Sequence, residues 1–183
     1  MTEDADAPSA ADIVAFWREV GPEGWFEKND DVDAEIRRRF MARYEEAAEG
    51  WLSAWALNAE GTLALLILLD QFPRNMFRGD KRAFATDEKA LSIASHGILN
   101  GFDSAFDDMR TFFYTPFMHS ENLSDQEEAI AFYHAYDNDS VKWAVMHADI
   151  IRRFGRFPHR NAVLGRATTP EEQAFLDDGG FAG

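Results

Sequence analysis

Residues 58–69, NAEGTLALLILL, decide the fold of this chain because they are apolar on nearly every face after the first turn. A helix that is apolar all round is buried in a larger core or inserted in a membrane. The unbroken run from Leu63 to Leu69 is far shorter than the roughly 20 residues of a membrane span. We therefore predict a central buried helix with neighbours on several sides. Burying its six Leu and Ile side chains contributes on the order of 10 kcal/mol, as an upper value.

Turn signals divide the sequence on both sides of this helix into further helical lengths. No segment between these signals alternates as a strand does. Two stretches, 124–127 and 169–172, have the capping-box pattern of Ser or Thr followed three positions later by Glu. The predicted helices span residues 9–20, 30–49, 58–69, 86–99, 104–117, 124–136, 139–154 and a short stretch after 169. The predicted fold class is all-α, with about seven to eight helices, and the short connections favour antiparallel helix pairs.

The composition is that of an ordinary globular protein. At 183 residues we expect a single helical domain, 1–183, with flexible ends at 1–8 and 179–183. The absence of cysteine excludes disulfides, thiolate metal sites and a cysteine nucleophile, and fits a reducing compartment. The first residues are acidic where a signal peptide would be basic and then apolar. These features predict a cytoplasmic protein.

The formal net charge of −15 predicts that nucleic acids and anionic membranes are not partners, because this surface would repel both. The sequence does not indicate an oligomeric state. Two segments are basic against this acidic background, residues 70–82 and 147–166. The second has a single acid, Asp149, against Arg152, Arg153, Arg156, Arg160 and Arg166. Their charge requires either internal acids or an external anion as a counterpart.

Two polar motifs lie in or beside these basic segments: LDQFPRNMFRG at 69–79 and HADIIRRFGRFPHRN at 147–161. Each has a charged residue on a helix with an apolar face, then Phe-Pro, then Arg and Asn. Because the two motifs are similar, we expect the loops 72–78 and 156–161 to lie side by side. Adjacent arginines repel one another, so a negative group must then lie between the loops. The internal candidates for that group are Asp70, Glu121 and Asp149.

Asp70 shares a helix face with Leu66 and Ile67, so its carboxylate is predicted to be buried. It also falls near the predicted end of helix 58–69, where the helix dipole disfavours an anion. A buried carboxylate is costly unless a cation pairs with it. The available cations are Arg74, Arg78, Arg156 and Arg160. The simplest interpretation is a structural ion pair that locks the loop, and a functional site is the alternative.

A third polar segment, PFMHSENLSDQE at 116–127, brings imidazole, hydroxyl and carboxylate groups to a turn between helices. Atoms suited to metal binding occur on His119, Glu121, His147 and Asp149. Their spacing matches no known ligand pattern, so neither a metal nor a cofactor is predicted. Ser120 lacks the context of a nucleophile elbow, which disfavours a serine hydrolase.

Three stretches together resemble a known bacterial family: LLDQFPRNMFRG at 68–79, PFMHSE at 116–121 and RFGRFPHRN at 153–161. The family is the one catalogued as domain of unknown function 924, and the resemblance extends from about Ile13 to Phe175. It implies a tetratricopeptide-like superhelical stack of helix pairs. No activity is attached to the family, so the resemblance assigns no catalytic residues.

Three functions fit these motifs. The first is a binding module that holds an anionic small molecule or peptide in an arginine-lined groove. Its candidate ligand-binding residues are Asp70, Arg74, Asn75, Arg78, His119, Glu121, His147, Arg156, His159, Arg160 and Asn161. The second is an enzyme with Asp70 or Glu121 as general base and His119 or His159 as acid. The third is a structural or interaction protein, in which acids inside the chain neutralise every arginine.

Overall fold

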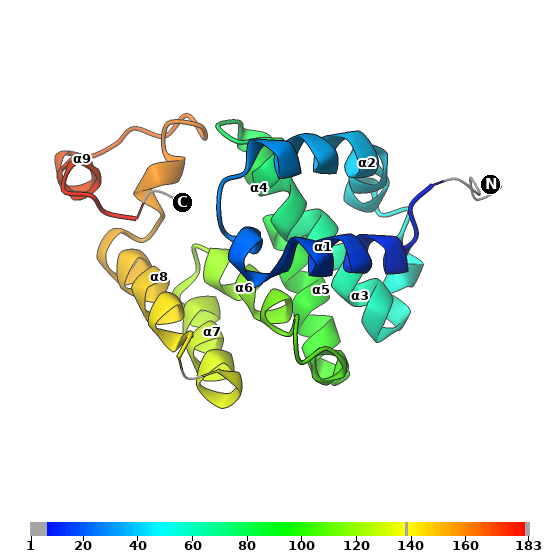
Figure 1. Ribbon diagram of the computed structural model, residues 1–183. Helices are drawn as coiled ribbons and strands as arrows, with labels where there is room; N and C mark the ends of the chain where they lie inside the picture. Colours follow the sequence, from blue (N-terminus) through cyan, green and yellow to red (C-terminus); the bar gives the residue numbers. More distant parts are fainter. Residues whose placement is uncertain (1–6, 138, 182–183) are drawn as a thin grey trace. The chain divides into compact units, whose positions relative to one another are not determined.

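The computed structural model describes residues 7–137 and 139–181, which are helical with no strand among them. Its α-helices, labelled in Figure 1, are α1 (Ala10–Trp25), α2 (Asp30–Glu49), α3 (Ala59–Leu66), α4 (Phe72–Met76), α5 (Asp87–Leu99), α6 (Thr111–His119), α7 (Leu123–Tyr136), α8 (Val141–Phe154) and α9 (Pro170–Asp177). The predicted all-α class is confirmed. Within the described part of the chain, no helix is both long and apolar enough to cross a membrane.

The chain forms two compact units. The N-terminal unit comprises residues 1–78 and 82–116, and the C-terminal unit comprises residues 79–81 and 117–183. The expected single domain and the superhelical stack both concern the whole chain and stay predictions. The flexible ends expected at 1–8 and 179–183 fall partly outside the described residues. Within the described part, the backbone oxygens of Ala7 and Pro8 accept hydrogen bonds from Arg43 of α2 at 3.3 and 2.8 Å.

The core of the N-terminal unit is built around the apolar helix predicted from residues 58–69. Every side chain from Leu63 to Leu69 is at most 2% exposed. In Figure 1, α1 and α2 cross in front of α3 and α4, and α5 lies behind. Trp17 and Phe72 meet edge to face, with ring centroids 5.4 Å apart. The central buried helix is therefore surrounded by neighbours, as its composition predicts.

This central helix does not end at Leu69, as the sequence predicts, but continues to Met76. The residues Ile67–Gln71 form a π-turn, in which the backbone N–H of Phe72 donates to Ile67 five residues earlier. A proline inside an α-helix cannot donate and its ring presses on the carbonyl four residues before. The wider π-turn accommodates Pro73, so α3, the π-turn and α4 form one continuous helix. Counted in this way, the described chain has the eight helices predicted.

Pro73 has no N–H to donate to the carbonyl of Leu69 four residues before it, and side chains bind this carbonyl and the next one. The hydroxyl of Thr86, at the start of α5, donates to the carbonyl oxygen of Leu69 at 2.6 Å. The guanidinium of Arg74 donates to the carbonyl oxygen of Asp70 at 2.5 Å. A buried carbonyl without a partner is unfavourable, so these two bonds are what allow the helix to widen here.

The start of three other helices can be compared with the starts predicted from the sequence. Helix α6 begins at Thr111, later than predicted, because Phe102–Ala105 form a separate 3-10 turn. Helix α7 is capped by Asn122, whose side chain accepts from the backbone of Ser124, so the predicted capping box at 124–127 is wrong. The other predicted capping box is confirmed, with Thr169 as the N-cap of α9.

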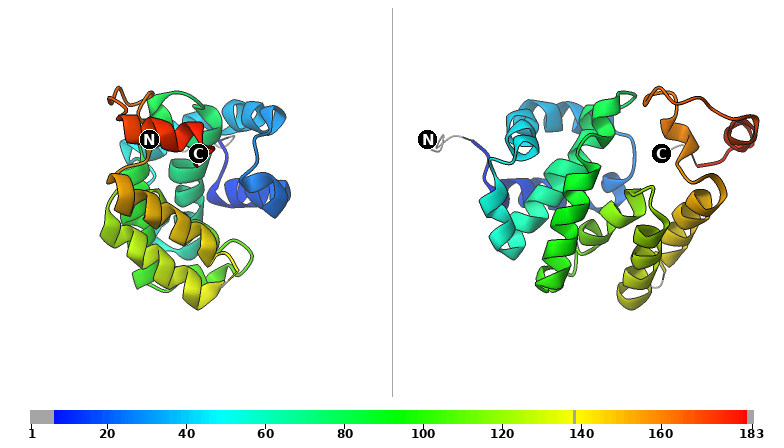
Figure 2. Two further views of the ribbon diagram at one scale, coloured as in Figure 1. Left: turned by 90° about the vertical axis from the view of Figure 1, so that its left-hand side faces the viewer. Right: turned by 180° about the vertical axis from the view of Figure 1, so that it is seen from behind.

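The C-terminal unit is a helical hairpin followed by a long return segment. Helices α7 and α8 pack side by side in Figures 1 and 2 and are joined by a short turn. After α8 the chain makes a 3-10 turn at Pro158–Arg160, enters α9 and folds back. The buried cluster of this unit is Ile150, Ile151 and Phe157, against which Phe154, Phe175 and Phe181 pack. Aromatic residues from three segments therefore meet on one side of α8.

Candidate functional site

The first predicted motif centres on Asp70, which is 0% exposed inside the π-turn. Its carboxylate forms an ion pair with Arg74, with a closest N–O separation of 3.3 Å. Gln71 donates to it at 2.5 Å and Thr115 at 3.3 Å. The predicted burial of Asp70 and its pairing with an arginine of the same motif are confirmed. The motif is helical, however, and not the loop that Phe-Pro suggests.

Arg74 is shared between two carboxylates. Besides Asp70, it holds Asp87 of α5 with two hydrogen bonds of 3.1 Å. Burial opposes the charge of this guanidinium, but Asp70 and Asp87 outweigh that effect and raise its pKa. Arg74 therefore stays a cation and ties the π-turn to α5.

Asn75 and Arg78 converge on a second buried carboxylate, that of Asp33 in α2, which is 3% exposed. Asn75 donates to it at 2.8 Å, and Arg78 donates twice, at 2.5 and 3.1 Å. Asp33 was missed at the sequence level. Its signal was its position three residues before the core residue Ile36 on the same helix face. All four candidate residues of the first motif thus take part in internal contacts of the N-terminal unit.

A similar arrangement surrounds Glu121, which belongs to the third polar segment, 116–127. Arg166 donates to both oxygens of this carboxylate, at 2.7 and 3.0 Å, and the backbone N–H of Phe157 donates at 2.8 Å. Burial opposes the charge of Glu121, but the hydrogen bonds from Arg166 and Phe157 prevail and lower its pKa. A carboxylate that accepts from these three donors is poorly suited to take up a proton, so the geometry gives no support to Glu121 as a general base.

Glu172, in the capping box of α9, is the centre of a further network. Arg156 holds both of its oxygens, at 2.6 and 2.9 Å. The backbone N–H of Thr169 and the amide of Asn161 donate to it at 2.7 and 3.2 Å. The hydrogen bond from Arg156 is the largest reason why the pKa of Glu172 falls to about 2. The candidate residues Arg156 and Asn161 therefore anchor α9 to the segment that follows α8.

Two of the three candidate histidines contact the same two phenylalanines, and the third lies beside one of these two histidines. The ring of His147 lies 5.7 Å from Phe157 and 4.6 Å from Phe181, centroid to centroid. The ring of His159 lies 5.6 and 5.2 Å from the same two rings. His119 lies 6.5 Å from His147. We call these five residues the histidine–phenylalanine cluster.

His147 is 7% exposed, and its Nδ1 atom lies 2.8 Å from the carbonyl oxygen of Trp143. Because a carbonyl only accepts, Nδ1 carries the proton and Nε2 has the lone pair in the neutral ring. Arg160 is 6% exposed and covers the face of Phe157, at 4.6 Å from the ring centroid. Across residues 7–137 and 139–181, no three His, Asp or Glu side chains are grouped so as to hold a metal ion.

An apolar groove of about 560 Å³ runs along α8 in the C-terminal unit. Its uncharged lining residues are Val145, Met146, Ile150, Phe154, Phe175, Gly179, Gly180 and Phe181. Its charged lining residues are Lys142, Asp149 and Arg153. Two of these charges have partners, since Arg153 pairs with Glu171 at 3.0 Å and Asp149 with Arg152 at 2.9 Å. Phe181 belongs both to this groove and to the histidine–phenylalanine cluster. The sequence did not reveal the groove, because phenylalanines at these spacings are typical of a core.

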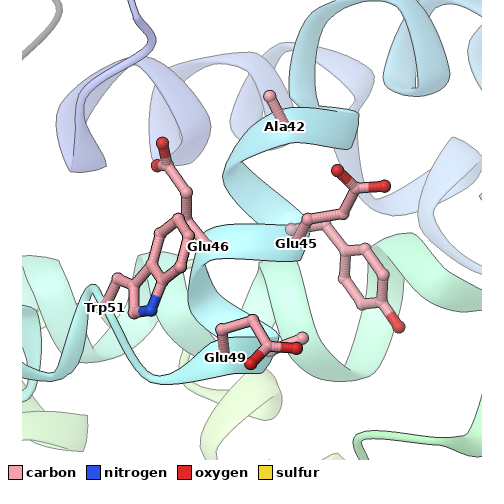
Figure 3. Close-up of a pocket in the computed structure, with 7 residues that line it drawn as sticks. Ala42, Glu45, Glu46, Glu49 and Trp51 are labelled. Carbon is pink, nitrogen blue, oxygen red and sulfur yellow. The ribbon is translucent and has the colours of Figure 1, made fainter.

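A second hollow of about 560 Å³ lies at the end of α2 in the N-terminal unit. Figure 3 shows Glu45, Glu46, Glu49 and Trp51 around it. Trp51 is 67% exposed, and Glu46 pairs with Arg43 at 2.6 Å. Three carboxylates repel an anion, so this hollow does not suit the ligand class predicted from the sequence.

The candidate arginines are largely engaged inside their own units. Arg74, Arg78 and Arg156 each hold a carboxylate. The two motifs belong to different units, so the expected side-by-side placement of the loops 72–78 and 156–161 stays a prediction. The internal ion pairs favour the structural interpretation of these arginines over an arginine-lined groove.

Comparison with known proteins places these observations in context. Residues 13–180 match the family described as "Bacterial protein of unknown function (DUF924)". No curated protein matches the chain. The chain is similar to the solved structure of ATU0120, a protein of unknown function from Agrobacterium tumefaciens. The sequence identity is 45%, the TM-score is 0.89, and the match covers 92% of this chain and 97% of the other.

Proposed function

Because the chain belongs to the DUF924 family of bacterial proteins of unknown function, whose description names no activity, we propose a function from its own geometry. It is a binding module that holds, in the groove along α8, a molecule with an apolar body and an anionic end. The observation that carries this proposal is an open apolar groove in a strongly acidic chain, with a lysine at its rim. The proposal keeps the predicted anionic ligand but moves it away from the arginines.

The floor of the groove suits an apolar body. Met146 and Ile150 lie one helical turn apart on α8, and Phe154 extends the same stripe. Phe175 forms part of the opposite wall. Sites for small ligands are concave and mostly apolar, with a few polar groups, and their volumes of about 300–1,000 Å³ include the volume found here.

The rim of the groove suits an anion. Lys142 is exposed, its ammonium group lies 5.3 Å from the ring centroid of Trp143, and its charge is the smallest of the causes that lower the pKa of Asp137. Arg153, one of the other charged residues of the groove, packs over Phe154 at 4.6 Å while pairing with Glu171. A ligand carboxylate therefore finds its counter-ion at Lys142.

The arginines of the two basic segments, 70–82 and 147–166, support this assignment by their contacts. Each of Arg74, Arg78, Arg156 and Arg166 already donates to a buried or half-buried carboxylate. Withdrawing such an arginine toward a ligand would leave its internal carboxylate without its cation, which is unfavourable. Lys142 is exposed, so turning it toward a ligand costs less than withdrawing one of these arginines.

The experiment is a calorimetric titration with decanoate, below its micelle concentration, and with the uncharged decanol. The wild type is expected to bind decanoate more tightly than decanol. This preference should be about two- to fivefold, the contribution of an exposed ion pair, and Lys142→Gln should remove it. Met146→Glu should weaken the binding of both ligands, because it places a charge in the apolar floor of the groove. Lys28→Gln and Leu99→Glu, at exposed positions of the N-terminal unit, are the matched controls.

Three results would overturn the proposal. One is a wild type that binds neither compound. Another is a Lys142→Gln variant that keeps the full preference for decanoate. The third is self-association of the wild type that Met146→Glu abolishes, because the groove would then be covered by a second copy of the chain.

A further inference from the structure

We infer that Glu172 positions the second wall of the groove along α8, and that the bound ligand and the docking of α9 therefore stabilise each other. This inference rests on the proposed function of that groove. It assigns to Glu172, which does not line the groove, the role of a positioning residue. It also gives the site a means of regulation, because a ligand that touches both walls binds only while α9 is docked.

The groove has one wall from α8 and another from α9 and the residues after it. Met146, Ile150 and Phe154 belong to α8, whereas Phe175 belongs to α9 and Phe181 follows it. The rings of Phe154 and Phe175 contact each other, with centroids 5.1 Å apart. In Figures 1 and 2, α9 lies near the C-terminal end of α8. The second wall therefore keeps its place only while α9 stays docked there.

Helix α9 cannot hold this place by its own helical stability. It is eight residues long, and an isolated helix of that length is marginal in water. Of its residues, all of which lie in the described part of the chain, Glu172 is the one that is buried. Phe175 is half-buried, so its ring contributes less to docking than a fully buried ring would. The docking of α9 therefore depends strongly on a carboxylate.

The contacts of Glu172 tie α9 to the segment that follows α8. Arg156 donates to both carboxylate oxygens, at 2.6 and 2.9 Å, and the amide of Asn161 donates at 3.2 Å. Asn161 in turn accepts from Arg166 at 3.0 Å. Arg166 holds Glu121, in the turn between α6 and α7, with hydrogen bonds of 2.7 and 3.0 Å. The carboxylate of α9 is therefore attached to a base that is itself fixed by an ion pair.

Removing the charge of Glu172 releases the second wall without changing the floor of the groove. Glu172→Gln keeps the length of the side chain but leaves Arg156, which is 27% exposed, without the carboxylate that it holds. Lys142 and the apolar floor stay on α8, so the preference for an anionic end should remain. A ligand that needs both walls loses affinity in proportion to the fraction of the protein in which α9 is docked.

The first test is calorimetric titration of decanoate and decanol. Glu172→Gln should weaken the binding of both compounds by about tenfold, the loss expected if α9 is docked one-tenth of the time. The preference for decanoate should not change, because Lys142 is intact. Asp177→Asn, which removes an exposed acid from the other end of α9, is the matched control and should leave both affinities unchanged.

The second test uses the wild type and follows hydrogen exchange of the α9 amides. At a free decanoate concentration of about ten times Kd, exchange from α9 should slow by about tenfold, because the opening of α9 competes with binding. Amides of α2, in the N-terminal unit, should exchange at the same rate with and without decanoate. Circular dichroism at the titration temperature checks the helix content of Glu172→Gln.

Two results would refute this inference and leave the proposed function intact. One is decanoate that binds the wild type without slowing exchange in α9, and the other is a Glu172→Gln variant with unchanged affinity. If Glu172→Gln loses helix beyond α9, the glutamate supports the whole C-terminal unit and the positioning role is refuted. A wild type that binds neither compound refutes the proposed function, and this inference with it.

Discussion

Replacing Asp70 by alanine tests the ion-pair network at the π-turn. The substitution removes a carboxylate that is 0% exposed and accepts from Gln71 and Thr115. Each of these donors then loses a partner in a buried site, at about 1–3 kcal/mol apiece. Arg74 keeps Asp87, through two hydrogen bonds of 3.1 Å, so the cation is not left alone. We therefore expect a loss of about 2–6 kcal/mol, the contribution of the two donors together.

The matched variants separate charge from packing. Asp70→Asn keeps the shape and an oxygen for Gln71 and Thr115, so it should cost less than Asp70→Ala. Asp87→Ala removes the more exposed carboxylate of Arg74 and should also cost less. Urea unfolding, followed by circular dichroism and tryptophan fluorescence, gives the free energy of unfolding. A change within about 0.5 kcal/mol for Asp70→Ala, or a larger loss for Asp87→Ala, would show that the burial argument is misplaced.

The remaining predictions concern α9 and the π-turn. The pKa of Glu172 is lowered from 4.5 to about 2, so its contribution to stability is complete above 4.5 and disappears as the pH falls through 2. Glu172→Gln should therefore be less stable than the wild type at pH 7, and the gap should narrow below pH 4.5 in urea midpoints measured across pH. Thr86→Val should cost about 1–3 kcal/mol, because the carbonyl oxygen of Leu69 loses the hydroxyl that binds it. A neutral Thr86→Val in the same unfolding assay would mean that water replaces this bond.

Much of the structure of the N-terminal unit could be predicted from the local pattern of apolar and charged residues in the sequence. The burial of Asp70 follows from its spacing to Leu66 and Ile67, and its partner Arg74 stands one helical turn away. The second partner, Asp87, could not be predicted, because it lies on another helix whose orientation no local pattern gives. The π-turn was missed for a similar reason. A Phe-Pro pair normally ends a helix, and the hydroxyl that offsets its effect comes from Thr86.

The candidate site of the C-terminal unit was predictable only in part. The three histidines were candidates because of their polar surroundings in the sequence. The structure places His147 and His159 against the same phenylalanines, and His119 beside His147. The sequence showed no sign of the groove, because Phe154, Phe175 and Phe181 are equally suited to a core. Whether an aromatic side chain fills a core or lines a groove depends on which segments return to it, and that is a tertiary property.

The π-turn at Ile67–Gln71 also constrains how this sequence can change in length. A π-turn contains one residue more than the α-helical turn it replaces. Deleting one residue there would therefore restore a regular α-helical turn and leave the residues beyond it close to their present faces. Inserting one more residue would instead rotate everything beyond the turn by about 100°. Arg74 and Asn75 would then turn away from Asp87 and Asp33, which lie on other helices. Point substitutions on the outer surface leave this geometry intact, whereas a single-codon insertion in this turn breaks both ion-pair networks at once.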